Sequence, residues 1–160
     1  MKRLLVVLLA SLAVFAAGML PAKASTAPKG HVVTTPEVVR WTGGQGEGPA
    51  STNCYNASRT TSYVLITTVF SYSLRINWCF KDNYGITSYS FNDSYWDCCS
   101  YQFEKYAGKT VSGGIGQPSV SEYHQAWFHE CFTICGSDIG LWNRMTGYGI
   151  GWDGKGGQVT

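Results

Sequence analysis

The chain has 160 residues, a length that corresponds to one domain with a core large enough to fold alone. Its 12 basic and 10 acidic residues give a formal net charge of +2 at pH 7, and they form no basic cluster after the first residues. Nucleic acid and anionic lipid are both bound through clustered Lys and Arg, so this charge distribution excludes both as partners.

The first 24 residues have the pattern of a secretory signal peptide. Lys2 and Arg3 precede an uncharged apolar run over 4–20, and the sequence AKA at 22–24 places small residues at −3 and −1 of a cleavage site. An uncleaved membrane anchor is the alternative, because the apolar run is nearly long enough to span a bilayer. Cleavage before Ser25 would remove three of the 12 basic residues and leave nine against ten acidic ones. We therefore predict a secreted, extracellular protein with no membrane segment after cleavage.

Residues 25–53 are rich in Thr, Pro, Gly and Ser, which is the composition of a flexible segment. Within them, the stretch HVVTTPEVVRW at 31–41 is able to form a short strand. Pro36 restricts such a strand to a sheet edge, because proline has no backbone N–H to donate. We predict a flexible N-terminal segment over 25–53, followed by a single β domain over 54–160.

The strongest pattern in the chain is a period of two over residues 64–80. Most odd positions are polar, and the apolar or aromatic even positions are Val64, Ile66, Phe70, Tyr72, Leu74, Ile76, Trp78 and Phe80. This alternation is typical of a half-buried strand. A straight strand of this length would extend roughly 56 Å, whereas a compact domain of this size is about 35 to 40 Å across. We therefore predict one strand that bends near residues 71–73 and keeps its inner face.

Further strands are indicated after this segment. KDNYG at 81–85 contains turn-forming Asp, Asn and Gly, so 74–92 is predicted to be a hairpin. AGKTVSGGIGQPS at 107–119 is predicted to be a loop, and the stretch at 120–132 is rich in β-formers and predicts a strand. Polar and aromatic residues occur at both parities of that strand, so no inner face is assigned to it.

A last strand is predicted over 141–146, and the glycine-rich end of the chain is predicted to be a flexible tail. No stretch of the mature chain has a convincing helical period. Together these patterns predict an all-β fold class, a small secreted antiparallel β-sandwich stabilised by disulfides.

All six cysteines lie after the signal peptide, and an even number in a secreted chain indicates disulfides. A bond between the neighbours Cys98 and Cys99 would close a strained eight-membered ring, so each is predicted to end a different cross-link. Their predicted partners are Cys54 and Cys79, in an order that the sequence does not assign.

Cys131 and Cys135 enclose three residues and are predicted to pair with each other, with a Cys79–Cys131 bond as the main alternative. A metal site is a second alternative, because His124 and His129 precede this pair closely and His and Cys are zinc ligands. A strand would direct the two histidines to opposite faces, and thiols outside the cell are usually oxidised. We predict no metal and no other cofactor, with His124 and His129 kept as the alternative ligands.

Paired carboxylates would indicate a glycoside hydrolase, because hydrolysis of sugars needs two carboxyl groups beside the scissile bond. Glu122 and Glu130 share a parity on the predicted strand, and Asp97, Asp138 and Asp153 fall in predicted loops. Surface solvation explains each of these acids more simply. A small secreted hydrolase that uses paired Glu and Asp is kept as an alternative function, as is a secreted toxin or antimicrobial protein.

Aromatic residues outside the main core strand give the preferred interpretation. Trp96 and Trp152 fall in predicted loops, and Tyr95 lies beside Trp96. Exposed aromatic rings stack on sugar rings and serve as anchors at interfaces. Burial explains Trp127 and Trp142 equally well. We predict a protein that binds an extracellular ligand, such as a carbohydrate or a cell-surface component, with Trp96, Trp152 and Tyr95 at the binding site.

Overall fold

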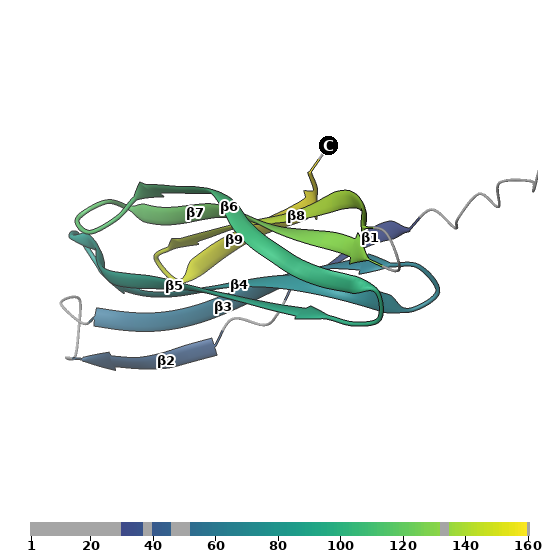
Figure 1. The fold of residues 1–160 in the computed structure, drawn as a ribbon. Helices are drawn as coiled ribbons and strands as arrows, with labels where there is room; N and C mark the ends of the chain where they lie inside the picture. The colour runs from purple at the N-terminus through teal and green to yellow at the C-terminus, as the bar shows by residue number, and fades with distance from the viewer. Residues whose placement is uncertain (1–29, 37–39, 46–51, 132–134, 160) are drawn as a thin grey trace, which may run out of the picture.

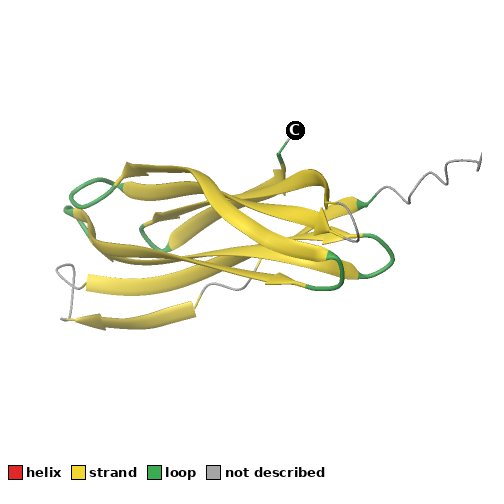
Figure 2. Ribbon diagram, viewed as in Figure 1, coloured by secondary structure: helices red, strands yellow, loops and turns green. Residues whose placement is uncertain are grey.

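The computed structural model describes residues 30–36, 40–45, 52–131 and 135–159 (Figure 1). Within these residues the regular elements are all β-strands (Figure 2). They are β1 (His31–Pro36), β2 (Arg40–Gln45), β3 (Thr52–Val64), β4 (Thr68–Lys81), β5 (Gly85–Asp97), β6 (Tyr101–Gly113), β7 (Ser119–Cys131), β8 (Cys135–Tyr148) and β9 (Gly151–Gln158). This part of the chain contains no helix long and apolar enough to cross a membrane. The predicted signal peptide at 1–24 lies outside the described residues.

The strands form two antiparallel sheets that pack face to face (Figure 1). In the five-stranded sheet, called sheet A, the order is β1-β3-β4-β5, and β2 also pairs with β3. The four-stranded sheet, called sheet B, has the order β6-β7-β8-β9. The predicted all-β architecture of two packed antiparallel sheets is confirmed.

The strands from β3 to β8 are long, with 13 or 14 residues each. Fourteen residues extend roughly 46 Å, so the sandwich is elongated along its strands (Figure 1). The prediction of one bent strand over 64–80 was wrong, because the bend assumed a spherical domain and the even-position alternation continues across a turn. The chain instead turns at residues 65–67, where Ile66 is 92 % exposed, and β4 follows. The alternation itself is confirmed from Phe70 to Trp78, whose even positions are all buried.

The turn between β4 and β5 confirms the hairpin predicted from KDNYG. Asn83 has a φ of 61° and Gly85 a φ of 96°, the left-handed region that Asn and Gly tolerate. A Cβ atom at Gly85 would lie 2.4 Å from the Gln117 carbonyl oxygen in the β6–β7 loop. Ile86 N donates a hydrogen bond of 2.8 Å to that same oxygen, so turns from the two sheets meet at this end of the sandwich.

The β6–β7 loop is shorter than predicted. Most of the stretch 107–119 is strand, because β6 continues to Gly113 and β7 begins at Ser119. Glycine content indicated a loop, but pairing with β7 orders the segment. The pairing is irregular between Ala107 and Thr110, which flank a glycine of positive φ.

Strand pairing begins earlier and ends later than the sequence indicates. β1 and β2 fall within the predicted flexible segment at 25–53, and they pair with opposite ends of β3. β1 is an edge strand of sheet A, as Pro36 predicts. The predicted flexible tail forms β9, which pairs with β8 over 141–148. Composition alone misses these strands, because it does not show the neighbouring strand that supplies their hydrogen bonds.

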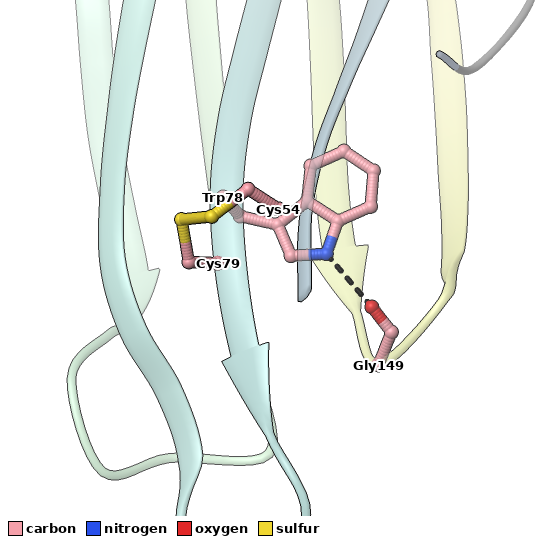
Figure 3. Close-up of a disulfide and its surroundings, with 4 residues drawn as sticks. All are labelled: Cys54, Trp78, Cys79 and Gly149. Carbon is pink, nitrogen blue, oxygen red and sulfur yellow. Dashed lines mark hydrogen bonds between the residues drawn. A yellow bond between two sulfur atoms is a disulfide. The ribbon is translucent and has the colours of Figure 1, made fainter. Parts of the chain in front are cut away.

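The core lies between the sheets, where the buried side chains of β4 meet those of β7 and β8. The rings of Phe70 and Phe128 stack with centroids 4.3 Å apart. Trp78 is 1 % exposed, and its Nε1 donates a 2.9 Å hydrogen bond to the Gly149 carbonyl oxygen after β8 (Figure 3). A Cβ atom at Gly147 would lie 2.7 Å from the indole ring, so glycine there allows this close packing.

The disulfide between Cys54 and Cys79 joins β3 to β4 (Figure 3). These cysteines are register partners with Cα atoms 4.0 Å apart, which the sequence could not show before the strand pairing was known. The predicted bonds from Cys98 and Cys99 to this pair are therefore wrong. Both are thiols at the β5–β6 connection, with Sγ atoms 2.8 Å apart.

Cys131 is disulfide-bonded, and its backbone pairs with that of Cys135. The side chain of Cys135 lies outside the described part of the structure. The alternative Cys79–Cys131 bond is excluded, because Cys79 is already bonded to Cys54.

Candidate functional site

A polar groove of about 330 Å³ lies on the outer face of sheet A, across β3, β4 and β5. Its lining residues are Ser58, Thr60, Ser73, Arg75, Asn77, Asn92, Asp93 and Ser94. All but Asp93 carry a hydroxyl, amide or guanidinium group that is able to hydrogen-bond a ligand. The groove is therefore lined by residues that carry hydrogen-bonding groups.

Strand register explains why these side chains gather on one face. Ser58 on β3, Arg75 on β4 and Asn92 on β5 are register partners across the three strands. Thr60 on β3 and Ser73 on β4 form the neighbouring row on the same face. Residues directly opposite each other in adjacent strands point to the same side of a sheet. The hydroxyls of Thr60 and Ser73 share a hydrogen bond of 2.7 Å, which fixes two of the groups in the groove.

Arg75 provides the positive charge of the groove. Its side chain is exposed, and no ion pair involving it occurs among the residues that the structure describes. Asp93 is the one acid in the groove lining, but its carboxylate accepts from Tyr72 and contacts His124 on the inner side of the sheet. The guanidinium is therefore available to a ligand.

The sequence signal for this groove lies in the odd positions of β4. Ser73, Arg75 and Asn77 form the polar side of the strongest alternation in the chain. Sequence reasoning assigned that side to solvent, because an alternating strand shows which face is polar and not whether the face is concave. No pattern in the sequence indicates that Ser58 and Asn92 belong to the groove, since only the pairing of three strands brings them beside Arg75.

The three predicted binding residues do not form one site. Trp96 is 50 % exposed, and it lies on the same outer face as Ser94, two residues further along β5. Tyr95 points to the other side of the strand, where its ring stacks on Phe103 with centroids 4.0 Å apart. Trp152 lies in β9 of sheet B and packs against the core. Trp96 alone is placed to extend the groove.

The candidate carboxylate pair of a hydrolase is not formed by Glu122 and Glu130. Eight residues of extended strand place their Cα atoms roughly 26 Å apart, whereas the two acids of a glycosidase are about 5 to 10 Å apart. Glu122 is also completely buried. Asp97, Asp138 and Asp153 lie within strands and not in the loops predicted for them.

The two histidines point to opposite faces of β7, as the strand period predicts. His124 is buried beside Asp93 and Glu122. His129 lies nearer the surface with Glu104 and Asp138, and its Nδ1 contacts the Asp138 carboxylate. Each histidine is therefore grouped with two carboxylates that are potential metal ligands.

Aromatic side chains cover part of the outer face of sheet B. Tyr123 and Trp142 lie with ring centroids 5.7 Å apart, and the Arg144 guanidinium is 5.9 Å from the centre of the Tyr123 ring. Trp127 Nε1 donates to Gln125 Oε1 at 3.3 Å. These indole rings are half-buried and in contact with their neighbours, whereas Trp96 is 50 % exposed.

The groove combines hydroxyl, amide and guanidinium groups on a sheet whose backbone is fixed by two hydrogen-bonded ladders. Such groups bind ligands rich in hydroxyl or carboxylate oxygens. A second depression of about 200 Å³ adjoins it at Asn77, beside the Cys54–Cys79 disulfide. Comparisons with protein-family models, with curated proteins and with solved structures found no match to this chain, so its function is inferred from this geometry.

Proposed function

We propose that the protein is a secreted binding module, and that it holds a glycan or a similar polyhydroxylated ligand in the groove on sheet A. The observation that carries the proposal is the concave row of Arg75, Asn77 and Asn92 with the exposed ring of Trp96 on the same face. Sugar hydroxyls donate to and accept from amide, hydroxyl and guanidinium groups, while the apolar face of a sugar ring stacks on an indole. Secretion is supported by the signal-peptide pattern and by the disulfide.

The size and support of the groove agree with such a ligand. Its volume is near the lower end of ligand sites, which are roughly 300 to 1,000 Å³, so it suits a few sugar units of a longer chain. The lining residues stand on three paired strands, and Cys54–Cys79 joins two of these strands beside the groove. A preformed surface of this kind loses little conformational entropy on binding.

A hydrolase has weaker support at this site. Asp93 is the one carboxylate in the groove lining, and its oxygen is engaged with Tyr72 and His124. General acid and base catalysis on a glycoside requires two carboxyl groups beside the same bond. Binding without hydrolysis is therefore the function that the groove supports.

The test is a binding screen of the purified protein against soluble polysaccharides and immobilised glycans, followed by calorimetry on any ligand found. Arg75→Ala and Trp96→Ala should each weaken binding about ten-fold or more, since anchor residues at interfaces contribute at least about 1.4 kcal/mol. Arg144→Ala is the matched control, because it removes an exposed arginine from the outer face of the other sheet.

Two outcomes would contradict the proposal. Full affinity in both Arg75→Ala and Trp96→Ala would remove the groove as the binding site. Loss of affinity in Arg144→Ala together with Trp142→Ala would move the site to the aromatic face of sheet B.

A further inference from the structure

A cluster of ionisable side chains lies between the sheets, near the edge formed by β5 and β6. Asp93 belongs to β5 in sheet A, and Glu122 and His124 belong to β7 in sheet B. One carboxylate oxygen of each acid and one ring nitrogen of His124 lie within 4.8 Å of one another. Glu122 and His124 are two residues apart on one strand, so both point to the same inner face.

The separations suit a single ion bound at the centre of the cluster. His124 Nδ1 lies 3.0 Å from Asp93 Oδ1 and 3.9 Å from Glu122 Oε1. For metal–ligand bonds of about 2.1 Å, two ligand atoms at a tetrahedral angle lie roughly 3.4 Å apart. The two observed distances bracket that value, and the third pair of ligand atoms, on Asp93 and Glu122, lies within 4.8 Å.

Glu122 is the residue that points to a missing ligand. Its side chain is 1 % exposed, and its Oε1 has no hydrogen-bond partner among the described residues. The Lys109 ammonium lies 3.3 Å from the other oxygen, Oε2. A buried carboxylate oxygen without a partner is costly, because nothing replaces the water that it loses on folding. A cation beside Oε1 would remove that cost.

Tyrosines hold two of the three groups in position. The Tyr72 hydroxyl donates a 2.5 Å hydrogen bond to Asp93 Oδ1. The His124 ring packs against Tyr106 with centroids 5.1 Å apart, and against the edge of Tyr72 at 6.2 Å. In metal sites, partners that bond to or pack on the ligands fix their orientation before the ion binds.

We propose that Asp93, Glu122 and His124 bind a divalent transition-metal ion, and that Zn²⁺ fits the site best. One imidazole nitrogen and two carboxylate oxygens form a donor set that Zn²⁺ accepts, whereas Ca²⁺ and Mg²⁺ prefer oxygen donors alone. The two charges of the ion would oppose those of the two carboxylates, and the exposed Lys109 ammonium beside Glu122 Oε2 adds a third positive charge at the rim of the site. Because the ligands come from both sheets, the ion would cross-link β5 to β7 and hold this edge of the sandwich closed.

A metal-free ion cluster is the competing explanation. A protonated His124 would donate to Asp93, and Lys109 would neutralise Glu122, so the charges would balance without an ion. That arrangement leaves Glu122 Oε1 without a hydrogen bond, whereas a metal ion satisfies it.

The surface group of Glu104, His129 and Asp138 supplies a matched control. It has the same residue types as the buried cluster, but His129 and Asp138 are about one-third exposed. Their charges are solvated, and His129 already contacts Asp138. A histidine substitution in each group separates binding at the buried site from adsorption at the surface.

The experiment uses the purified protein without a polyhistidine tag, stripped of metal with EDTA. Titration with Zn²⁺ by calorimetry should show one ion per chain, and saturation should raise the melting temperature by several degrees, since the ion binds only the folded state. His124→Gln and Glu122→Gln should each weaken Zn²⁺ binding at least about ten-fold, and Tyr72→Phe should weaken it about ten-fold. His129→Gln should leave the binding constant unchanged.

Absence of stoichiometric Zn²⁺ uptake would overturn the proposal and leave the metal-free ion cluster. Uptake that disappears in His129→Gln and persists in His124→Gln would assign the ion to the surface group. If the buried variants do not fold, X-ray absorption on the Zn²⁺ complex of His129→Gln decides, because this variant lacks the imidazole of the surface group. One imidazole with oxygen donors supports the site, and sulfur donors would assign the ion to Cys98 and Cys99.

Discussion

Thr61 on β3 donates a 2.5 Å hydrogen bond to Asn143 Oδ1 on β8, across the interior of the sandwich. Both residues are 0 % exposed, and Asn143 Nδ2 donates in turn to the Tyr72 carbonyl oxygen at 2.9 Å. A fully paired polar network in an apolar core fixes the relative position of the elements that it joins. Here it fixes one register between sheet A and sheet B.

The stability effects of changing Thr61 and Asn143 should be coupled. Thr61→Val leaves Asn143 Oδ1 buried without this donor, and we expect a loss of about 1 to 3 kcal/mol in the free energy of unfolding. The double variant Thr61→Val with Asn143→Leu should lose less than the sum of the single variants. Denaturant unfolding of all three measures the coupling, and strictly additive losses would show that the two side chains act independently.

The cysteine arrangement gives a prediction in mass spectrometry. With Cys98 and Cys99 as thiols and two disulfides elsewhere, the intact protein should be lighter than its fully reduced form by four hydrogens. Alkylation before reduction should label two sites, and Cys99 should react faster because it is exposed. A difference of six hydrogens would mean that Cys98 and Cys99 are oxidised, and it would contradict their assignment as thiols.

The two candidate tryptophans should differ in their effect on stability. Trp152→Ala removes a ring that packs against the core, so we expect a loss of about 1 to 3 kcal/mol. Trp96→Ala removes a half-exposed ring and should change stability by less than about 0.5 kcal/mol. Thermal unfolding of both variants makes the comparison, and a large drop for Trp96→Ala would show that this ring is packing and not a binding surface.

Burial of Tyr101 should make the free energy of unfolding depend on pH in the alkaline range. Burial, with a smaller contribution from Glu130, raises the pKa of Tyr101 to about 12 from its ordinary value of 10.0. The unfolded chain releases this proton at lower pH than the folded protein, so the stabilisation is fully present below about pH 10 and is lost as the pH rises to about 12.

Unfolding free energies measured from pH 9 to pH 12 should therefore fall less steeply for Tyr101→Phe than for the wild type. The lysines titrate in both proteins, so the difference between the two curves isolates the phenol. Parallel curves would contradict the assignment.

Sequence patterns predicted the strands whose two faces differ in polarity. In β4 the buried even positions from Phe70 to Trp78 alternate with polar residues, so its inner face was correctly predicted. In β7 the inner face carries Glu122 and His124, while Tyr123 and Trp127 lie outside. Polarity therefore does not mark the buried side of β7, and its inner face could not be read from the sequence.

The groove and the inner cluster depend on contacts that no local pattern records. Arg75 and Asn92 are adjacent because β4 and β5 pair in one register. Asp93 and His124 are 31 positions apart in the chain, and they meet only because the two sheets pack together. If a strand shifted by one residue against its partner, its side chains would turn to the opposite face of the sheet, and the pair that depends on it would be lost.

The connection at 98–100 separates the two sheets along the chain, so the strands of sheet A are synthesised before those of sheet B. In the described chain, β1 to β5 form sheet A and β6 to β9 form sheet B, so every ladder of sheet A precedes residue 101. As the chain emerges, sheet A is complete while Leu74, Ile76 and their neighbours still have no covering strand. Transiently exposed apolar surface of this kind promotes aggregation. A chain truncated after residue 100 should therefore self-associate, and the protein needs its second half to remain monodisperse as well as to complete its fold.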